Sequence, residues 1–289
     1  MRITEHRMVE LAAQGLSTAR GRVASSAEEL TSGLHVSRPS QNPAAWAETR
    51  RAAALQTINS GRGEALARSQ ERLMDVDQAL GQIGGAMARA QELAVAASSE
   101  TIGPEALRAI AAELHGLRLT ALAAANTRGS DGEYILAGTR SADPPFDDSG
   151  VYHGDDVGRD IETQNGLEQA VTVTGSVLTA SHGIDVLAAM SAFETALDAN
   201  DRTGITAAIE AMRTGNQQVS SARADGGAKS MSLLAAQDAQ SQLDTSLTAL
   251  QSRLAAADPI AAASELAQHS QSLAAAQAVA QTIAELTRP

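Results

Sequence analysis

The sequence contains no cysteine, which excludes disulfides, thiol nucleophiles and cysteine-ligated zinc. It contains only five aromatic residues: Trp46, Tyr134, Phe146, Tyr152 and Phe193. Aromatic side chains bury more area than any others. A chain with 43% hydrophobic but 2% aromatic residues must therefore build its interior from Ala, Leu, Val and Ile. Such a composition favours thin seams between helices over a broad globular core.

Basic clusters and long apolar runs are missing too. The longest basic run is Arg50-Arg51, and a net charge of −12 opposes binding to phosphates. No stretch approaches the ~18 consecutive apolar residues that a membrane span requires, and the polar amino-terminal segment lacks the apolar part of a secretion signal. We therefore expect no nucleic-acid partner, no membrane insertion and no Sec-type export.

Both ends of the chain carry a heptad pattern of small and aliphatic residues, which predicts terminal helices with one apolar seam each. Ordering the backbone costs roughly 1–2 kcal/mol per residue, and burial returns only about 25 cal/mol per Å² of apolar area. An Ala-rich and Ser-rich seam buries little area, so we expect these seams to be covered by other subunits. The alternative is a helical bundle completed within one monomer. The predicted assembly residues are Val9, Leu16, Val23, Leu30, Leu266, Leu273, Val279 and Ile283.

A joint is predicted after the first helix, because a glycine and two prolines interrupt the pattern. The second proline suits the first turn of a new helix. The single tryptophan is expected to anchor this joint by packing, with a contact to a partner as the alternative. The joint residues are Ser32, Gly33, Pro39, Asn42, Pro43 and Trp46.

The middle of the chain separates into helical and β-like parts. Leu66, Leu73, Leu80 and Met87 recur at sevens and predict a long second helix, and a third helix is expected from Pro104 to Asn126. Gly, Asp, Ser and Pro then dominate up to about residue 181, between short runs with strand character. These runs predict a small antiparallel β module, expected to be peripheral, with strands at 134–136, 151–153, 160–163 and 170–174.

Together these patterns predict a mainly α protein with a small inserted antiparallel β module. Long antiparallel heptad helices from both termini are expected to form a coiled-coil hairpin or bundle. The expected segments are an amino-terminal coiled-coil segment (1–42), the first part of a helical rod (43–133), the β module (134–181), the return part of the rod (182–255) and a carboxy-terminal coiled-coil segment (256–289).

The sequence offers little catalytic chemistry. His153-Gly154-Asp155-Asp156 could supply metal ligands, but a turn in which the Asp side chains bond the nearby backbone is the favoured interpretation. The HExxH, GxSxG, Walker and GxGxxG motifs are all absent. We therefore expect no enzyme activity, no catalytic residue, no metal and no cofactor.

Several segments, taken in order, resemble the flagellin family. Residues 30–34 and 39–45 resemble its amino-terminal motif, a Leu-x-Ser-Gly turn followed by Ser-Asp-Asp-Pro-Ala, although Gln41-Asn42 replaces the Asp pair. Residues 90–95 resemble the Arg-x-Leu-Ala-Val segment of the family. Within the family, residues 134–139, 145–146 and 151–155 are similar to the branch of hook-associated junction proteins. The carboxy-terminus departs from the family pattern because it lacks a Leu-rich ending.

The resemblance implies a structural adaptor of the bacterial flagellum that is exported without a Sec signal. Expected partners are further copies in a homo-oligomeric ring, another hook-associated protein on the hook side, flagellin on the filament side and an export chaperone. The terminal helices would form the axial core, and the β module would make outward or lateral contacts. The alternatives are flagellin itself, or a cytoplasmic coiled-coil adaptor from outside the family.

Overall fold

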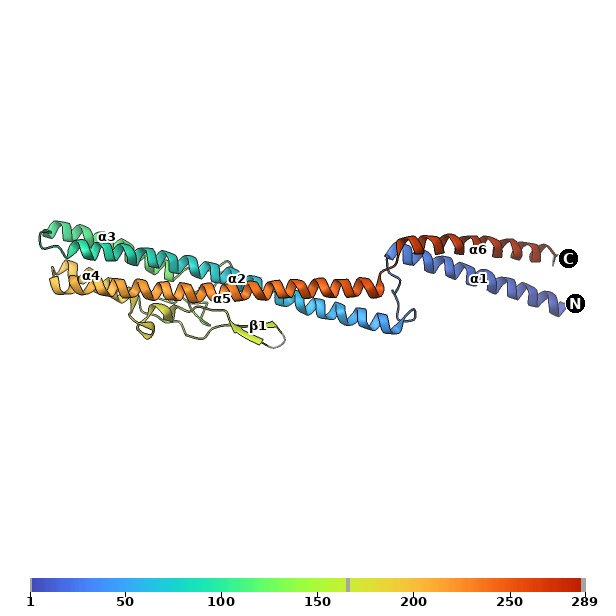
Figure 1. The fold of residues 1–289 in the computed structure, drawn as a ribbon, viewed down its shortest axis with the longest axis horizontal. Helices are drawn as coiled ribbons and strands as arrows, with labels where there is room; N and C mark the ends of the chain where they lie inside the picture. The colour runs from blue at the N-terminus through green and yellow to red at the C-terminus, as the bar shows by residue number, and fades with distance from the viewer. Residues whose placement is uncertain (1, 165–166, 287–289) are drawn as a thin grey trace. The chain divides into compact units, whose positions relative to one another are not determined.

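The computed structural model describes residues 2–164 and 167–286 and is mainly helical (Figure 1). None of the described helices combines the length and the apolar character needed to cross a membrane. The mainly α fold with a small antiparallel sheet confirms the predicted fold class. In chain order the elements are α1 (Arg2–Ser32), α2 (Pro43–Ala97), α3 (Pro104–Ala125), β1 (Asp160–Gln164), β2 (Leu167–Ala170), the short helices η1 (Gly175–Leu178) and η2 (Ala180–His182), α4 (Val186–Asp198), α5 (Arg202–Ala255) and α6 (Pro259–Leu286).

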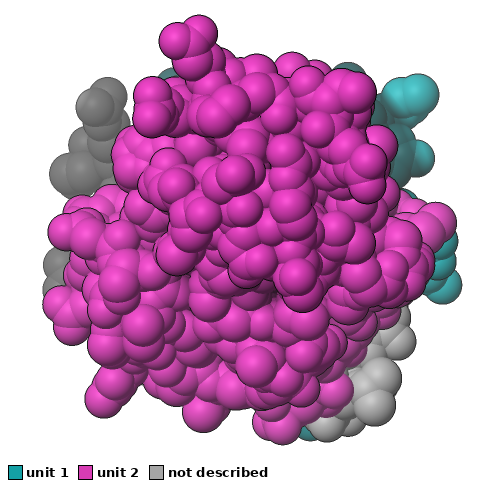
Figure 2. Space-filling view, turned by 90° about the vertical axis from the view of Figure 1, so that its left-hand side faces the viewer, with its two compact units in different colours: residues 1–59, 242–289 teal, residues 60–241 magenta. Residues whose placement is uncertain are grey.

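The chain divides into two compact units, which Figure 2 shows in separate colours. Unit 1 comprises residues 1–59 and 242–289, and unit 2 comprises residues 60–241. The division falls inside α2 and α5, so each of these helices contributes to both units. The five predicted segments follow the helix breaks instead, and they remain a prediction.

The core of unit 2 is the heptad seam predicted for α2. Leu66, Leu80 and Met87 are completely buried. From α5, Met212 and Val219 are equally buried. Hydrogen bonds between the two helices show that they are antiparallel, because residue numbers rise along one helix as they fall along the other. Arg223 bonds Asp77 at 2.8 Å, and Gln70 bonds Ser230 at 2.6 Å. The seven-residue repeat thus marks an antiparallel helix pair in which aliphatic side chains supply the apolar burial.

Helices α3 and α4 extend this core. Pro104 begins α3 as predicted, and Leu107 and Leu114 are buried on one face of the helix. Phe193 of α4 is also buried, and Glu194 accepts hydrogen bonds from His115 at 2.7 Å and from Arg118 at 3.3 Å. The imidazole of His115 therefore serves a structural contact between the two helices.

The module at 127–185 differs from the predicted one in two respects. The predictions of strands at 134–136 and 151–153 were wrong. Tyr134 forms only a single bridge with Arg128, and Tyr152 forms only a single bridge with Phe146. Hydrogen bonds between loops hold this backbone in place of strand pairing; for example, Gly175 N–H donates to the Leu136 carbonyl at 2.7 Å. The antiparallel pairing is confirmed, and β1 lies where a strand was predicted, but its partner β2 lies at Leu167–Ala170, so the predicted strand at 170–174 was wrong beyond residue 170. The expectation of a peripheral module was also wrong, because Ile135, Leu136, Phe146, Val171, Val173 and Leu178 belong to the same buried cluster as the α2 heptad.

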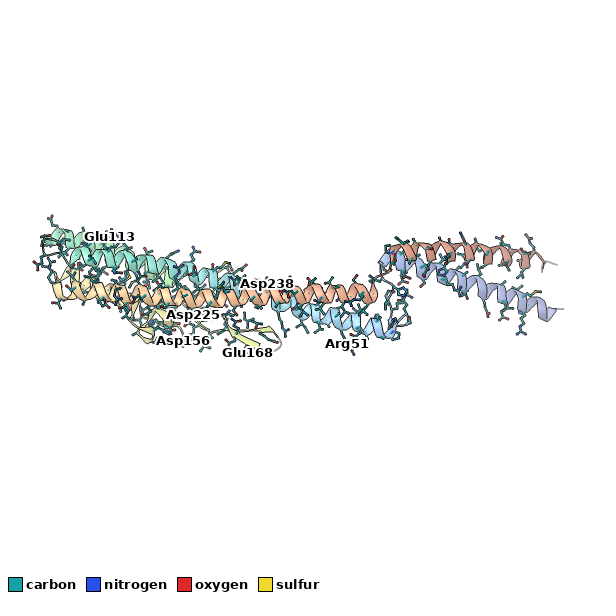
Figure 3. The ribbon with its side chains drawn as sticks, viewed as in Figure 1. Arg51, Glu113, Asp156, Glu168, Asp225 and Asp238 are labelled. Carbon is teal, nitrogen blue, oxygen red and sulfur yellow. The ribbon has the colours of Figure 1, made fainter. Side chains whose placement is uncertain are left out.

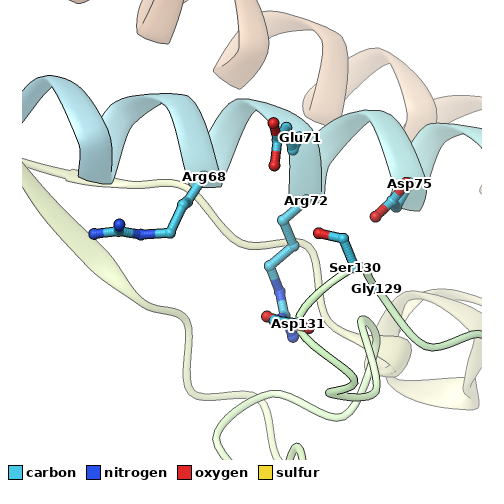
Figure 4. Close-up of a pocket in the computed structure, with 7 residues that line it drawn as sticks. All are labelled: Arg68, Glu71, Arg72, Asp75, Gly129, Ser130 and Asp131. Carbon is cyan, nitrogen blue, oxygen red and sulfur yellow. The ribbon is translucent and has the colours of Figure 1, made fainter.

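Polar side chains from the helices hold this module in place. Arg72 of α2 reaches the loop that contains Gly129 to Asp131 (Figure 4) and donates to the carbonyls of Tyr134 at 2.9 Å and Ile135 at 3.3 Å. From α5, Lys229 donates to the Thr172 carbonyl at 2.8 Å. Buried carbonyls in irregular backbone need such donors, because no ladder supplies them. Gln218 of α5 donates to the carbonyls of Val177, Thr179 and Ile184.

Two glycines in the module provide a matched stability test. Gly132 and Gly138 both have positive φ angles, +79° and +70°. A Cβ at Gly132 meets nothing within 4 Å, whereas a Cβ at Gly138 would lie 2.4 Å from the backbone oxygen of Asp155. Gly132→Ala should cost only the left-handed penalty of about 1–2 kcal/mol. Gly138→Ala adds overpacking, for a total of about 2–5 kcal/mol.

Urea unfolding of the two variants beside the parent chain measures both costs. Gly132→Ala serves as the control for backbone strain alone. Equal losses of unfolding free energy in the two variants would contradict the close approach of Gly138 to Asp155.

Candidate assembly surface

Helices α1 and α6 of unit 1 pair along one seam. Ser26 of α1 and His269 of α6 are hydrogen-bonded at 2.7 Å. From this pair, the covered residues of each helix recur at alternating spacings of three and four residues, as in a coiled coil. Five of the predicted assembly residues are half-buried at these positions: Leu16, Val23, Leu266, Leu273 and Ile283. Part of the predicted assembly seam is therefore covered within one chain.

The other three predicted assembly residues, Val9, Leu30 and Val279, are exposed. Val279 lies off the α6 seam, because Ala276 and Ala280 hold the half-buried positions between Leu273 and Ile283. Val279 was predicted as a seam residue because it is aliphatic and larger than its neighbours, but the smaller Ala276 and Ala280 occupy the seam. Further large apolar side chains are exposed beside them in unit 1, and sequence reasoning missed these: Met8, Leu11, Leu34, Leu55, Ile58, Leu243 and Ile260.

Unit 1 exposes more apolar side chains than its size predicts. Of the seventeen large hydrophobic residues that are exposed in the described chain, ten lie in this smaller unit. The main buried cluster of the described residues lies wholly in unit 2. Large apolar patches mark interaction sites, and unit 1 is rich in the exposed side chains from which such a patch is built. Unit 1 is therefore the candidate surface for packing against other chains.

The predicted joint connects the two chain segments of unit 1. Gly33 adopts a left-handed conformation with φ +69°, ends α1 and donates to the Glu29 carbonyl at 2.9 Å. The Ser32 hydroxyl accepts a bond from Leu34 N–H at 3.2 Å. The joint also bonds the connection between α5 and α6: His35 N–H donates to the Ala255 carbonyl at 2.7 Å, and the Gly33 carbonyl accepts from Ala257 at 2.9 Å.

The remaining joint residues begin α2. The Asn42 side chain accepts a bond from Ala45 N–H at 3.1 Å, which caps the helix that Pro43 begins. Gln41 accepts bonds from the backbone of residues 37 and 38, at 2.7 and 2.9 Å, around the exposed Pro39. Amide oxygens of Gln41 and Asn42 therefore accept backbone bonds at this joint without adding negative charge. Trp46 is half-buried, and the Arg50 guanidinium lies 5.4 Å from its ring centroid.

Charge is distributed unequally between the units. Unit 1 contains nine acidic and nine basic residues, so the net charge of −12 belongs wholly to unit 2. Glu113 of α3, Asp156 of the module and Asp225 of α5 are among the acidic residues of unit 2 (Figure 3). Net charge opposes close packing of like copies. Copies can therefore approach through unit 1 with far less repulsion than through unit 2.

The segment 153–156 is irregular and is held by its carboxylates. Asp155 accepts bonds from the Thr139 hydroxyl, from Thr139 N–H at 2.8 Å and from Val157 N–H at 3.2 Å, and these bonds lower its pKa. The Ser176 and Thr174 hydroxyls, each at 2.6 Å, lower the pKa of Asp156. Only the bond from Val157 N–H is of the local backbone kind that the turn interpretation expects, and the others come from residues distant in the chain, so that interpretation stays a prediction. In the described part of the chain, no group of three or more His, Asp or Glu side chains is arranged to hold a metal ion.

Residues 6–141 of the chain match the bacterial flagellin N-terminal helical region. It is similar to flagellar hook-associated protein 3 of Salmonella typhimurium, with 28% identity over 155 residues, 53% of this chain and 49% of that protein. The relative from Escherichia coli K12 with the same name gives the same figures. The chain thus matches about half the length of the curated relatives.

Solved structures share the fold. A structure of Bacillus cereus FlgL has a TM-score of 0.57 and 21% identity, covering 69% of this chain and 96% of that one. The flagellar junction protein FlgL from Legionella pneumophila has a TM-score of 0.52 and 14% identity, covering 64% and 97%.

Proposed function

We propose that this protein is a structural adaptor of the bacterial flagellum that joins the hook, through another hook-associated protein, to the flagellin filament. The observation that carries the proposal is the composition of unit 1, which has no net charge, lies outside the main buried cluster and exposes ten large apolar side chains of the described chain. The names of the similar proteins, hook-associated protein 3 and flagellar junction protein, support the same role.

In this role, unit 1 packs against copies of itself and against the neighbouring flagellar layers. Fully burying one Leu, Val, Ile or Met side chain gains about 1.5–3 kcal/mol. Met8, Leu11, Ile260 and Val279 in every copy would therefore each add favourable apolar burial to contacts in a ring. Unit 2 folds around its own core and carries the net negative charge of the chain.

Export and location follow from the same role. The protein would travel unfolded through the flagellar secretion apparatus, with an export chaperone, and would act outside the cell. A chain without cysteine suits this route, because it needs no oxidative step on arrival.

Immunogold labelling of isolated hook–basal bodies and filaments tests the proposal. We expect one band of label at the distal end of the hook. Label along the whole filament would identify a flagellin instead, because the flagellin helical region at residues 6–141 fits a filament subunit equally well. Label confined to the cytoplasm would exclude both roles, and antibody against the hook protein serves as the position marker.

A further inference from the structure

A polar pair interrupts the seam between α1 and α6. Ser26 is only 4% exposed, and its hydroxyl oxygen lies 2.7 Å from Nδ1 of the half-buried His269. The preceding seam residue on α1, Val23, and the following one on α6, Leu273, are apolar. A Ser and a His contribute less apolar burial than aliphatic residues at the same positions would, so this pair adds little to stability by burial.

The rest of the seam specifies alignment poorly. Ala12 and Ala19 occupy alternate positions on α1, and Ala262, Ala276 and Ala280 occupy positions on α6. Because the pattern repeats every seven residues, a shift of α6 by one heptad along α1 again places small and aliphatic residues opposite one another. Within the seam, shape and burial therefore separate the native alignment only weakly from its shifted neighbours, and the joint bonds of Gly33 and His35 to the α5–α6 connection act only at one end of the pair.

We infer that the Ser26–His269 pair sets the register in which α1 and α6 pair. A shift by one heptad places Ser26 opposite Ala276 or Ala262, and His269 opposite Ala19 or the end of α1. A serine in a helix can then bond a carbonyl of its own preceding turn. The imidazole has no such local partner, so the shift that places it opposite Ala19 leaves a polar group without its bond in the seam, and the opposite shift moves it to the end of α1 and still breaks the pair. One polar seam position is sufficient to select register in a coiled coil.

This inference concerns the single chain and does not depend on the flagellar role proposed above. The absence of cysteine makes it testable, because two introduced cysteines are the only thiols in this 289-residue chain. Ala19→Cys with Ala276→Cys reports the native register. Two further pairs report shifts by one heptad, one in each direction: Ala19→Cys with Ile283→Cys, and Ala12→Cys with Ala276→Cys. A disulfide forms only where the two Cα atoms lie within about 7 Å.

Mild oxidation followed by non-reducing gel electrophoresis gives the disulfide yield of each reporter. In the parent background, we expect the native reporter to exceed both shifted reporters by about tenfold or more. Adding Ser26→Ala with His269→Leu should reduce this ratio to about threefold or less. The matched control, Ser25→Ala with Gln268→Leu, changes exposed neighbours by the same chemistry and should leave the ratio unchanged.

His269→Asn distinguishes a register role from a general loss of packing. The shorter amide keeps a polar group near the position of Nδ1, so we expect the native reporter to dominate again. The inference is overturned if the shifted reporters stay at the parent level in Ser26→Ala/His269→Leu. It is also overturned if the native reporter fails to form a disulfide in the parent background.

Discussion

Leu11→Asp is expected to abolish swimming without changing the thermal unfolding of the purified protein. Leu11 is 61% exposed on α1, so a carboxylate there keeps its water in the free chain. In the assembled ring, the same carboxylate would be buried against a neighbouring copy without a partner, which costs several kcal/mol. Because every copy carries the change, the penalty repeats around the ring. Swimming in soft agar, flagellin shed into the medium and calorimetry of the monomer together measure the effect.

Two further variants separate assembly from folding. Leu234→Asp places the same charge on an exposed leucine of unit 2 and should leave swimming intact. Val23→Asp is less informative, because Val23 already lies half-buried in the α1–α6 seam of its own chain. That change should weaken helix pairing in the monomer as well as assembly. Normal swimming in the Leu11→Asp strain would refute an assembly role for the exposed face of α1.

Deleting residues 144–174, with a short Gly/Ser bridge, is expected to unfold most of unit 2. The segment contains Phe146, Val171 and Val173, all of which are buried in the main cluster. Removing one buried Phe side chain typically costs 3–5 kcal/mol, and a whole domain is stable by only about 5–15 kcal/mol. The deletion also removes the Thr172 carbonyl that accepts a bond from Lys229. Far-UV circular dichroism and thermal unfolding measure the loss of helix.

A smaller deletion provides the control. Replacing only residues 161–169 removes the hairpin of β1 and β2, where Glu162 and Glu168 are exposed. The ion pair between Arg62 and Glu162 at 2.5 Å is lost, but exposed pairs contribute little, about 0–1 kcal/mol. We expect near-normal helix content in this variant. If the larger deletion also melts like the parent chain, the module makes no contribution to the core.

Local patterns in the sequence determined the helices of this protein. Residues at seven-residue spacing identify the α2 seam, because side chains with that period return to the same face of a helix. Pro43, Pro104 and Pro259 each begin a helix, because a proline in the first turn breaks no internal hydrogen bond. The order of the segments at 30–45, 90–95 and 134–155 also carried the resemblance to the flagellin family.

Only the tertiary structure shows which apolar side chains are buried between these elements and which stay exposed. Val279 and Ala276 both fit a helical repeat, and only packing against α1 shows that the alanine occupies the seam. The module residues have weak local periodicity, so their burial against α2 and α5 depends on contacts between segments far apart in the chain. The pairing of Ser26 with His269 joins residues 243 positions apart. No local pattern encodes such pairings, because each depends on which surfaces remain free once the long helices have packed.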